Sequence, residues 1–217
     1  MGEPLPTTVV SVNVSEPRLV AWRETQVATG IFKIPVDHRM RVRALNLDGD
    51  GQADLSVHGG PDKAIYVYPA EHYPWWQAQL DRIDLRWGHF GENFTTAGLL
   101  ETSVHIGDRF RIGSAEVVVT QPRLPCCKLG IRFGRSDMPK RFLASRRTGF
   151  YLRVLREGEV GPGDALELVE TESNRVAVAD VTELYLASDA RQDLLRALLQ
   201  VSALPPGWRD EFETRLT

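Results

Sequence analysis

Short runs of β-branched and aromatic residues, each stopped by glycine or proline, fill the first 170 residues of the chain. Such runs predict strands, and their close spacing favours a β-barrel or sandwich over alternating strand–helix units. The expected strands are residues 9–14, 30–36, 41–47, 64–68, two within 103–121, and a last hairpin of 150–155 with 165–169. Helices are expected at 70–80 and within 128–147.

Apolar side chains change to helical spacing near the end of the chain, in residues 181–185, 194–201 and 208–216. Three such short amphipathic helices are too small to be stable alone, so we expect them to lie against the barrel. The predicted organisation is therefore a mainly β domain over residues 1–170, followed by a small three-helix segment over residues 171–217.

Composition excludes several classes of protein. A chain of 217 residues with 42% hydrophobic and 25% charged residues is typical of a globular protein that buries a sizeable core. A formal net charge of −3 argues against attraction to nucleic acid. No apolar run approaches the roughly 18 residues of a membrane helix, and the first residues do not resemble a signal segment. The two cysteines are adjacent, which excludes a disulfide framework, so we expect a reduced, cytoplasmic protein.

The most informative segment is QPRLPCCKLG at residues 121–130. Cys126 and Cys127 follow a proline and lie between two cations, Arg123 and Lys128, which can stabilise a thiolate. A thiolate is a nucleophile and a soft metal ligand. The alternative is a buried cysteine that acts only as a small hydrophobic side chain. The segment alone does not say which of the two cysteines is reactive.

A second candidate is the loop HGGPDK at residues 58–63. Gly59 and Gly60 can turn backbone N–H groups toward an anion, and Lys63 adds a positive charge. His58 could donate a hydrogen bond to a ligand, although a histidine beside a turn is more often structural. Asp62 after proline is equally typical of a simple turn.

Two further segments carry weaker signals. In FGENFTTAGL, at residues 90–99, Asn93 offers neutral hydrogen-bonding groups, but a simple turn is the favoured interpretation. Arg146 and Arg147 precede a glycine and a strand, and arginine forks bind phosphate and carboxylate in bidentate fashion. Residues 123–156 hold ten Lys and Arg and a single acidic residue, which favours either an anion-binding surface or a solvated face.

Together these segments resemble the MOSC family, named after the C-terminal domain of molybdenum-cofactor sulfurases. The motifs that carry the resemblance occur in family order: HGGPDKAIYVYP, FGENFTTAGL, IGDRFRIG, QPRLPCCKLG and RTGFYLRVL. The resemblance is strongest to the stand-alone bacterial YiiM-like type, and the tail from VADVTELYL onward is similar to that type's three-helix extension.

The resemblance implies a MOSC-type β-barrel that binds the molybdenum cofactor, a molybdopterin dithiolene with a phosphate. It implies that Cys126 is the molybdenum ligand and the catalytic residue. The cofactor-binding positions carried over are His58, Gly59, Gly60, Asp62, Lys63, Asn93, Gln121, Arg123, Lys128 and Arg147. One departure from the family pattern is the second cysteine, Cys127, which could compete for the metal.

By the same resemblance, the expected activity is reduction of N-hydroxylated bases such as 6-hydroxylaminopurine, with electrons from a partner flavoprotein reductase. The family is also associated with pyridoxal phosphate binding. Two alternatives stay open at this point: a sulfur carrier with a persulfide on Cys126, and a non-enzymatic protein that binds and delivers the cofactor. We expect no nucleic-acid or membrane partner.

Overall fold

A computed structural model describes residues 7–53, 59–81, 84–187 and 191–216. Its strands are β1 (Thr8–Val14), β2 (Arg18–Trp22), β3 (Thr25–Thr29), β4 (Ile34–Val36), β5 (Met40–Val42), β6 (Ile65–Pro69), β7 (Phe94–Ala97), β8 (Arg109–Ile112), β9 (Ala115–Pro122), β10 (Phe150–Arg156), β11 (Gly158–Val160) and β12 (Leu166–Glu170). Its helices are η1 (Pro61–Lys63, a 3₁₀ turn), α1 (His72–Leu80), α2 (Cys127–Phe133), α3 (Met138–Ala144), α4 (Val178–Leu186), α5 (Gln192–Gln200) and α6 (Pro206–Glu213). The predicted mainly β class is confirmed.

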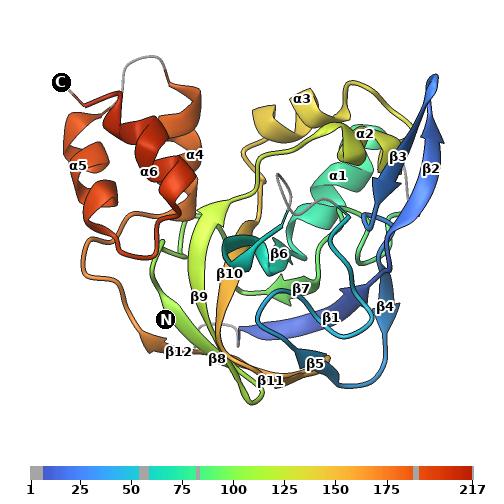
Figure 1. The fold of residues 1–217 in the computed structure, drawn as a ribbon, viewed down its shortest axis with the longest axis horizontal. Helices are drawn as coiled ribbons and strands as arrows, with labels where there is room; N and C mark the ends of the chain where they lie inside the picture. The colour runs from blue at the N-terminus through green and yellow to red at the C-terminus, as the bar shows by residue number, and fades with distance from the viewer. Residues whose placement is uncertain (1–6, 54–58, 82–83, 188–190, 217) are drawn as a thin grey trace.

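The main sheet is strongly curved, with the strand order β12-β8-β9-β10-β6-β7-β1-β4 (Figure 1). Its neighbouring strands are antiparallel except for β6 and β7, which run parallel. The ladder is not continuous around the barrel. Instead, a single bridge between Thr8 and Ala165 joins the start of β1 to the segment before β12. The amide of Val9 donates to the carbonyl of Asp164 at 2.9 Å beside this bridge. The predicted barrel is therefore an eight-stranded sheet that curls back on itself.

The burial of side chains along each strand explains which strands could be predicted from the sequence pattern. Strand β8 alternates exposed and buried side chains, as expected for a strand with one face in the core. Strand β9 is buried almost throughout, because it lies between β8 and β10 in the sheet and also contacts α4. A second, aromatic cluster lies under α1, α2 and α3 and is built around Tyr68, Trp76, Phe90 and Phe142.

Some of the structure expected from the sequence was wrong, above all the pairing of the last strands. Residues 150–155 and 165–169 do not form a hairpin, since β10 pairs with β9 and β6 while β12 pairs with β8. The reason is the short strand β11 between them, which leaves the main sheet and pairs with β5. Residues 90–99, interpreted as a turn, contain β7, which pairs with both β1 and β6. The expected helical region 128–147 is two helices, divided at Gly134 with φ +63°.

The three predicted C-terminal helices are present. Figure 1 shows them in orange and red, with α4 beside strand β9. Their apolar sides join the main core through Val181, Leu195, Leu198, Trp208 and Phe212. The predicted boundary near residue 170 stays a prediction; β12 ends at Glu170 and α4 begins at Val178. No helix within the described part of the chain is long and apolar enough to cross a membrane.

Candidate functional site

A polar pocket opens where the segment before α2 meets the start of β6 and the loops before β4 and after β5. Its volume is about 110 Å³. We call it the cysteine pocket and define it by the side chains that give it its chemistry: Lys33, Asp50, Lys63, Tyr66, Asn93, Arg123, Cys126, Lys128 and Tyr151. Segments more than 100 residues apart thus contribute to one site.

The two adjacent cysteines line different cavities. Strand β9 ends at Pro122, and the chain reaches Cys126 in an extended conformation, with φ −125°, directly before α2. Cys126 is half-buried and lines the cysteine pocket. Cys127 is exposed as the first residue of α2 and lines a separate small pocket with Trp22 and Pro139. The geometry therefore gives only Cys126 access to the cationic side chains of the cysteine pocket.

Arg123 is one of two buried cations of this pocket, with 6% of its surface exposed; the other is Lys33, at 7%. Its Nη1 donates to the carbonyl of Phe90 at 3.0 Å, and the guanidinium lies 4.7 Å from the centre of the Tyr66 ring. Burial lowers the pKa of Arg123, but its interactions with Tyr66, Tyr151 and Cys126 outweigh this and hold the pKa above its ordinary value. Arg123 is thus a fixed and permanently charged wall of the pocket.

Lys63 and the two tyrosines respond to burial in opposite ways. Burial lowers the pKa of Lys63, while the nearby carboxylate of Asp62 and the charge of Cys126 act to raise it. Burial raises the pKa of both Tyr66 and Tyr151, so their phenols stay protonated at neutral pH. Because the Tyr66 phenol donates to the carbonyl of Thr148, the neutral phenol that the pocket can offer as a hydrogen-bond donor is that of Tyr151, together with positive charge.

A buried hydrogen-bond network supports one wall. The carboxylate of Asp50 forms an ion pair with Lys33 and accepts hydrogen bonds from the Ser15 amide at 3.0 Å and from Asn93 Nδ2 at 2.8 Å. Asn93 Oδ1 accepts the amide of Tyr66 at 3.0 Å, which links the network to β6. Asn93 was predicted as a site residue. Lys33 and Asp50 were not, because no local pattern marks two residues that meet only through folding.

The predicted loop residues mostly face a second cavity, on the other side of η1. This helix-side pocket is lined by Gly59–Lys63, Gln121 and Leu124 from the barrel and by Tyr185, Pro205–Trp208 and Glu211 from the C-terminal helices. Gly60 has φ +93°, and no atom of the other described residues lies within 4 Å of the place a Cβ would take; its N–H donates to Gln52 Oε1 at 3.2 Å. Asp62 forms an ion pair with Arg153. Thus Gly59, Gly60, Asp62 and Gln121 line the helix-side pocket, and Lys63 lines both.

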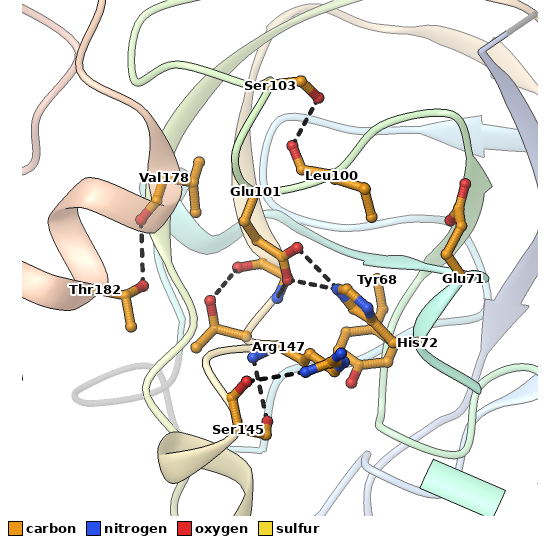
Figure 2. A network of polar contacts seen from close by, with 12 residues as sticks. Tyr68, Glu71, His72, Leu100, Glu101, Ser103, Ser145, Arg147, Val178 and Thr182 are labelled. Atoms are coloured by element: carbon orange, nitrogen blue, oxygen red, sulfur yellow. Dashed lines mark hydrogen bonds and ion pairs between the residues drawn. The ribbon is translucent and has the colours of Figure 1, made fainter. Parts of the chain in front are cut away.

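Arg147 lines neither pocket. Its guanidinium lies 4.3 Å from the centre of the Trp75 ring, and Nη1 donates to the carbonyl of Ser145 at 3.2 Å. Figure 2 shows this side chain beside the buried pair of His72 and Glu101, whose Nε2 and Oε2 are 2.8 Å apart. The other predicted position, His58, lies outside the described residues.

The basic stretch 123–156 divides between the pocket and the surface. Arg123 and Lys128 line the cysteine pocket, whereas five arginines form ion pairs with acidic residues on or near the surface. These pairs are Arg135–Asp137, Arg141–Asp137, Arg146–Glu183, Arg153–Asp62 and Arg156–Glu116. The charge that appeared concentrated in the sequence is therefore partly compensated, by Asp137 within the stretch and by Glu183, Asp62 and Glu116 from elsewhere in the fold.

Metal-ligating side chains are sparse around Cys126. Across the described ranges, no group of three His, Cys, Asp or Glu residues is placed to hold a metal ion. What the pocket provides is one thiol among cations. Chemically, this arrangement suits an anionic group that brings most of its own ligands, or a covalent adduct on sulfur.

Comparison with known proteins agrees with the fold and the motif order. The MOSC domain model matches residues 54–167, and the model of the YiiM-like, 3-alpha helix domain matches residues 176–217. An uncharacterized protein, YflK of Bacillus subtilis, is 42% identical over 94% of this chain and 92% of its own length. The crystal structure of YiiM from Geobacillus stearothermophilus superposes with a TM-score of 0.82 at 35% identity, covering 98% of this chain and all of that one. A protein named Reductase from Gibberella moniliformis is 32% identical over 81% of this chain, which spans 32% of that protein's length.

Proposed function

The chain belongs to the MOSC domain family and carries its YiiM-like three-helix domain, and from that premise we propose that it is a molybdenum-cofactor-dependent reductase. The observation that supports this most is the position of Cys126. Its thiol lies in a pocket with four cationic side chains, Lys33, Lys63, Arg123 and Lys128. Such a site favours a thiolate and an anionic ligand together.

The donor set fits this cofactor. Molybdopterin brings two dithiolene sulfurs to the metal, so the protein needs to add only one soft ligand, and Cys126 is the thiol of the cysteine pocket. At about 110 Å³ the cavity is below the roughly 300 Å³ of a typical small-molecule site, so it suits the metal-bearing end of the cofactor. MOSC domains are associated with molybdenum-cofactor binding as a family.

In this proposal the role of the protein is to hold and orient the cofactor. Lys63, Arg123 and Lys128 offset the negative charge of the cofactor, and Arg123 is held in place by Phe90 and Tyr66. When bound, the cofactor supplies two-electron redox chemistry at the metal. Burial raises the pKa of Tyr151, and the charge of Cys126 acts in the same direction. The phenol therefore keeps its proton and can donate a hydrogen bond inside the pocket.

The proposed reaction is the reduction of an N-hydroxylated substrate such as 6-hydroxylaminopurine. The N–O bond breaks, two electrons and two protons are consumed, and the products are the amine and water. We propose a flavoprotein reductase as the partner that supplies the electrons. A relative whose name is Reductase supports a reductive reaction, although this chain spans about a third of its length.

The first test is molybdenum content by elemental mass spectrometry, on protein made in a host that produces the cofactor. We expect near-stoichiometric molybdenum in the wild type and in Cys127→Ser, and little in Cys126→Ser. Cys127→Ser is the matched control, because it removes the neighbouring thiol, which faces another cavity. Loaded protein should then reduce hydroxylamine and 6-hydroxylaminopurine with an artificial electron donor.

Other outcomes identify the alternatives. Absence of molybdenum in every sample, from a host shown to load a control enzyme, together with a 32 Da adduct on Cys126, would replace the reductase with a persulfide carrier. Stoichiometric molybdenum that exchanges readily and supports no turnover would indicate a protein that delivers the cofactor. Pyridoxal phosphate binding and a cytoplasmic location stay predictions.

A further inference from the structure

The helix-side pocket is the larger of the two cavities around η1. Its volume is about 410 Å³, against about 110 Å³ for the cysteine pocket, which places it in the range of small-molecule sites. One wall is the barrel, and the opposite wall is built from α4 and α6. The C-terminal helices therefore do more than cover the sheet, because without them this cavity has no second wall.

The helical wall has the chemistry of a site for a flat ring. Tyr185 and Trp208 lie with their ring centroids 5.6 Å apart and an interplanar angle of 62°, and Pro205 and Pro206 extend the apolar surface. Trp208 is held in place, since its indole N–H donates to Gln121. Glu211 adds a carboxylate, which accepts hydrogen bonds from N–H groups. Aromatic walls with one acceptor suit a planar nitrogen heterocycle.

The two pockets adjoin but differ in charge. Both are lined by Lys63 and Leu124, so they meet at this part of the wall, and Leu124 is two residues from Cys126. The cysteine pocket is lined by four cations and one carboxylate, Asp50, which is paired with Lys33. The helix-side pocket is lined by one cation, Lys63, and by the carboxylates of Asp62 and Glu211. A phosphate or dithiolene is thus favoured on the cysteine side. A neutral ring with N–H groups is favoured on the helix side.

We propose that the helix-side pocket is the subsite for the aromatic ring of the substrate, with Tyr185 and Glu211 as its specificity-determining residues. The ring stacks against the aromatic wall, Glu211 accepts an N–H of the heterocycle, and the N-hydroxyl group extends past Leu124 toward Cys126. This inference rests on the proposed reductase function. It gives the C-terminal helices a direct part in substrate choice.

The test compares two substrates of different size on cofactor-loaded protein. Glu211→Gln and Tyr185→Ala should each raise KM for 6-hydroxylaminopurine about fivefold to tenfold, because one aromatic or hydrogen-bonding contact is lost. The KM for hydroxylamine, which has no ring, should not change. Glu213→Gln is the matched control, since Glu213 is exposed on the same helix α6 and does not line the pocket. Both substituted residues are exposed, so the fold should tolerate the changes.

A second measurement does not need turnover. Isothermal titration of the wild type with adenine should give a Kd that Glu211→Gln and Tyr185→Ala weaken by a similar factor and Glu213→Gln leaves unchanged. If both substrates are reduced and neither variant alters KM or Kd for the ring, the subsite is refuted while the reductase stands. If either variant instead loses its molybdenum, the pocket holds the cofactor and the inference is overturned. If no substrate is reduced but adenine binding still depends on both residues, the reductase proposal fails and the ring site is supported.

Discussion

The buried ion pair of Lys33 and Asp50 gives the sharpest test of how the cysteine pocket is held together. The side chains are 8% and 4% exposed, so neither charge is solvated by bulk water. Removing one member of such a pair costs about 3–5 kcal/mol of folding free energy, because the other charge is left buried without its partner. In Lys33→Met, Asp50 still accepts hydrogen bonds from Ser15 and Asn93. We therefore expect the lower end of that range, about 3 kcal/mol.

Adding Asp50→Asn to Lys33→Met should restore part of the stability. The double variant removes the buried charge and keeps one acceptor oxygen, so it loses about one hydrogen bond, worth about 1 kcal/mol. We expect it to be more stable than Lys33→Met alone by about 1–2 kcal/mol. A double variant that is more stable than the single variant is expected if the destabilisation comes from an unpaired buried charge. It is not expected if the destabilisation comes only from lost packing.

The assay is equilibrium urea unfolding of wild type, both single variants and the double variant, followed by circular dichroism. In thermal melts of a chain this size, a loss of about 3 kcal/mol corresponds to a decrease in Tm of about 6–12 °C. The reasoning is refuted if Lys33→Met is destabilised by less than about 1 kcal/mol, or if the double variant is no more stable than Lys33→Met.

Three further predictions concern the surroundings of the site. Gly149→Ala should destabilise the fold by more than about 2 kcal/mol in urea unfolding, since φ is +60° and the new Cβ would lie 2.2 Å from the carbonyl oxygen of Val67. Tyr66→Phe should cost about 1–2 kcal/mol, because the phenol donates to the carbonyl of Thr148 at 2.9 Å. Lys63 has a pKa below its ordinary 10.5, so the folded state releases its proton first; wild type should gain stability relative to Lys63→Met as pH rises from that lowered pKa toward 10.5.

Each of these predictions has a contradicting result. A Gly149→Ala protein as stable as wild type would mean that β6 moves freely away from it. Equal stability of Tyr66→Phe and wild type would show that the Thr148 carbonyl finds another donor. A difference between wild type and Lys63→Met that is constant or falls with rising pH would show that burial does not lower the pKa of Lys63.

Local pattern was enough to predict the elements that place apolar residues on one face. Strand β1 and the three C-terminal helices contribute buried side chains to the core, and β6 and β9, which are buried on both faces, appear as continuous runs of β-branched and aromatic residues. The hairpin of β2 and β3 gave no such signal, since Leu19 is 71% exposed and, within the described part of the chain, the two strands pair only with each other. Pairing of β10 and β12 was mispredicted because the short strand β11 diverts the chain to β5, which precedes it by more than 100 residues.

The candidate site was predictable in its parts and not in its arrangement. Cys126, Lys63 and Arg123 were found from charge and motif, and they line one pocket. Arg147 had the same kind of signal, yet its guanidinium lies over Trp75, a residue on a helix that the chain reaches 70 residues earlier. Sequence spacing identifies side chains able to bind an anion, but only the fold decides which of them find a partner inside the protein.

The separation of two neighbouring pockets depends on η1. A 3₁₀ turn has three residues per turn, so the successive side chains Asp62 and Lys63 point in directions about 120° apart. Asp62 turns to Arg153, while Lys63 also reaches the pocket of Cys126. Strand β9 fixes this turn, because the Thr120 hydroxyl and the Gln121 amide both donate to the carbonyl of Asp62, at 2.7 and 3.2 Å. Gln121 also accepts the Trp208 indole, so the same strand sets the cation beside Cys126 and the aromatic wall of the helix-side pocket.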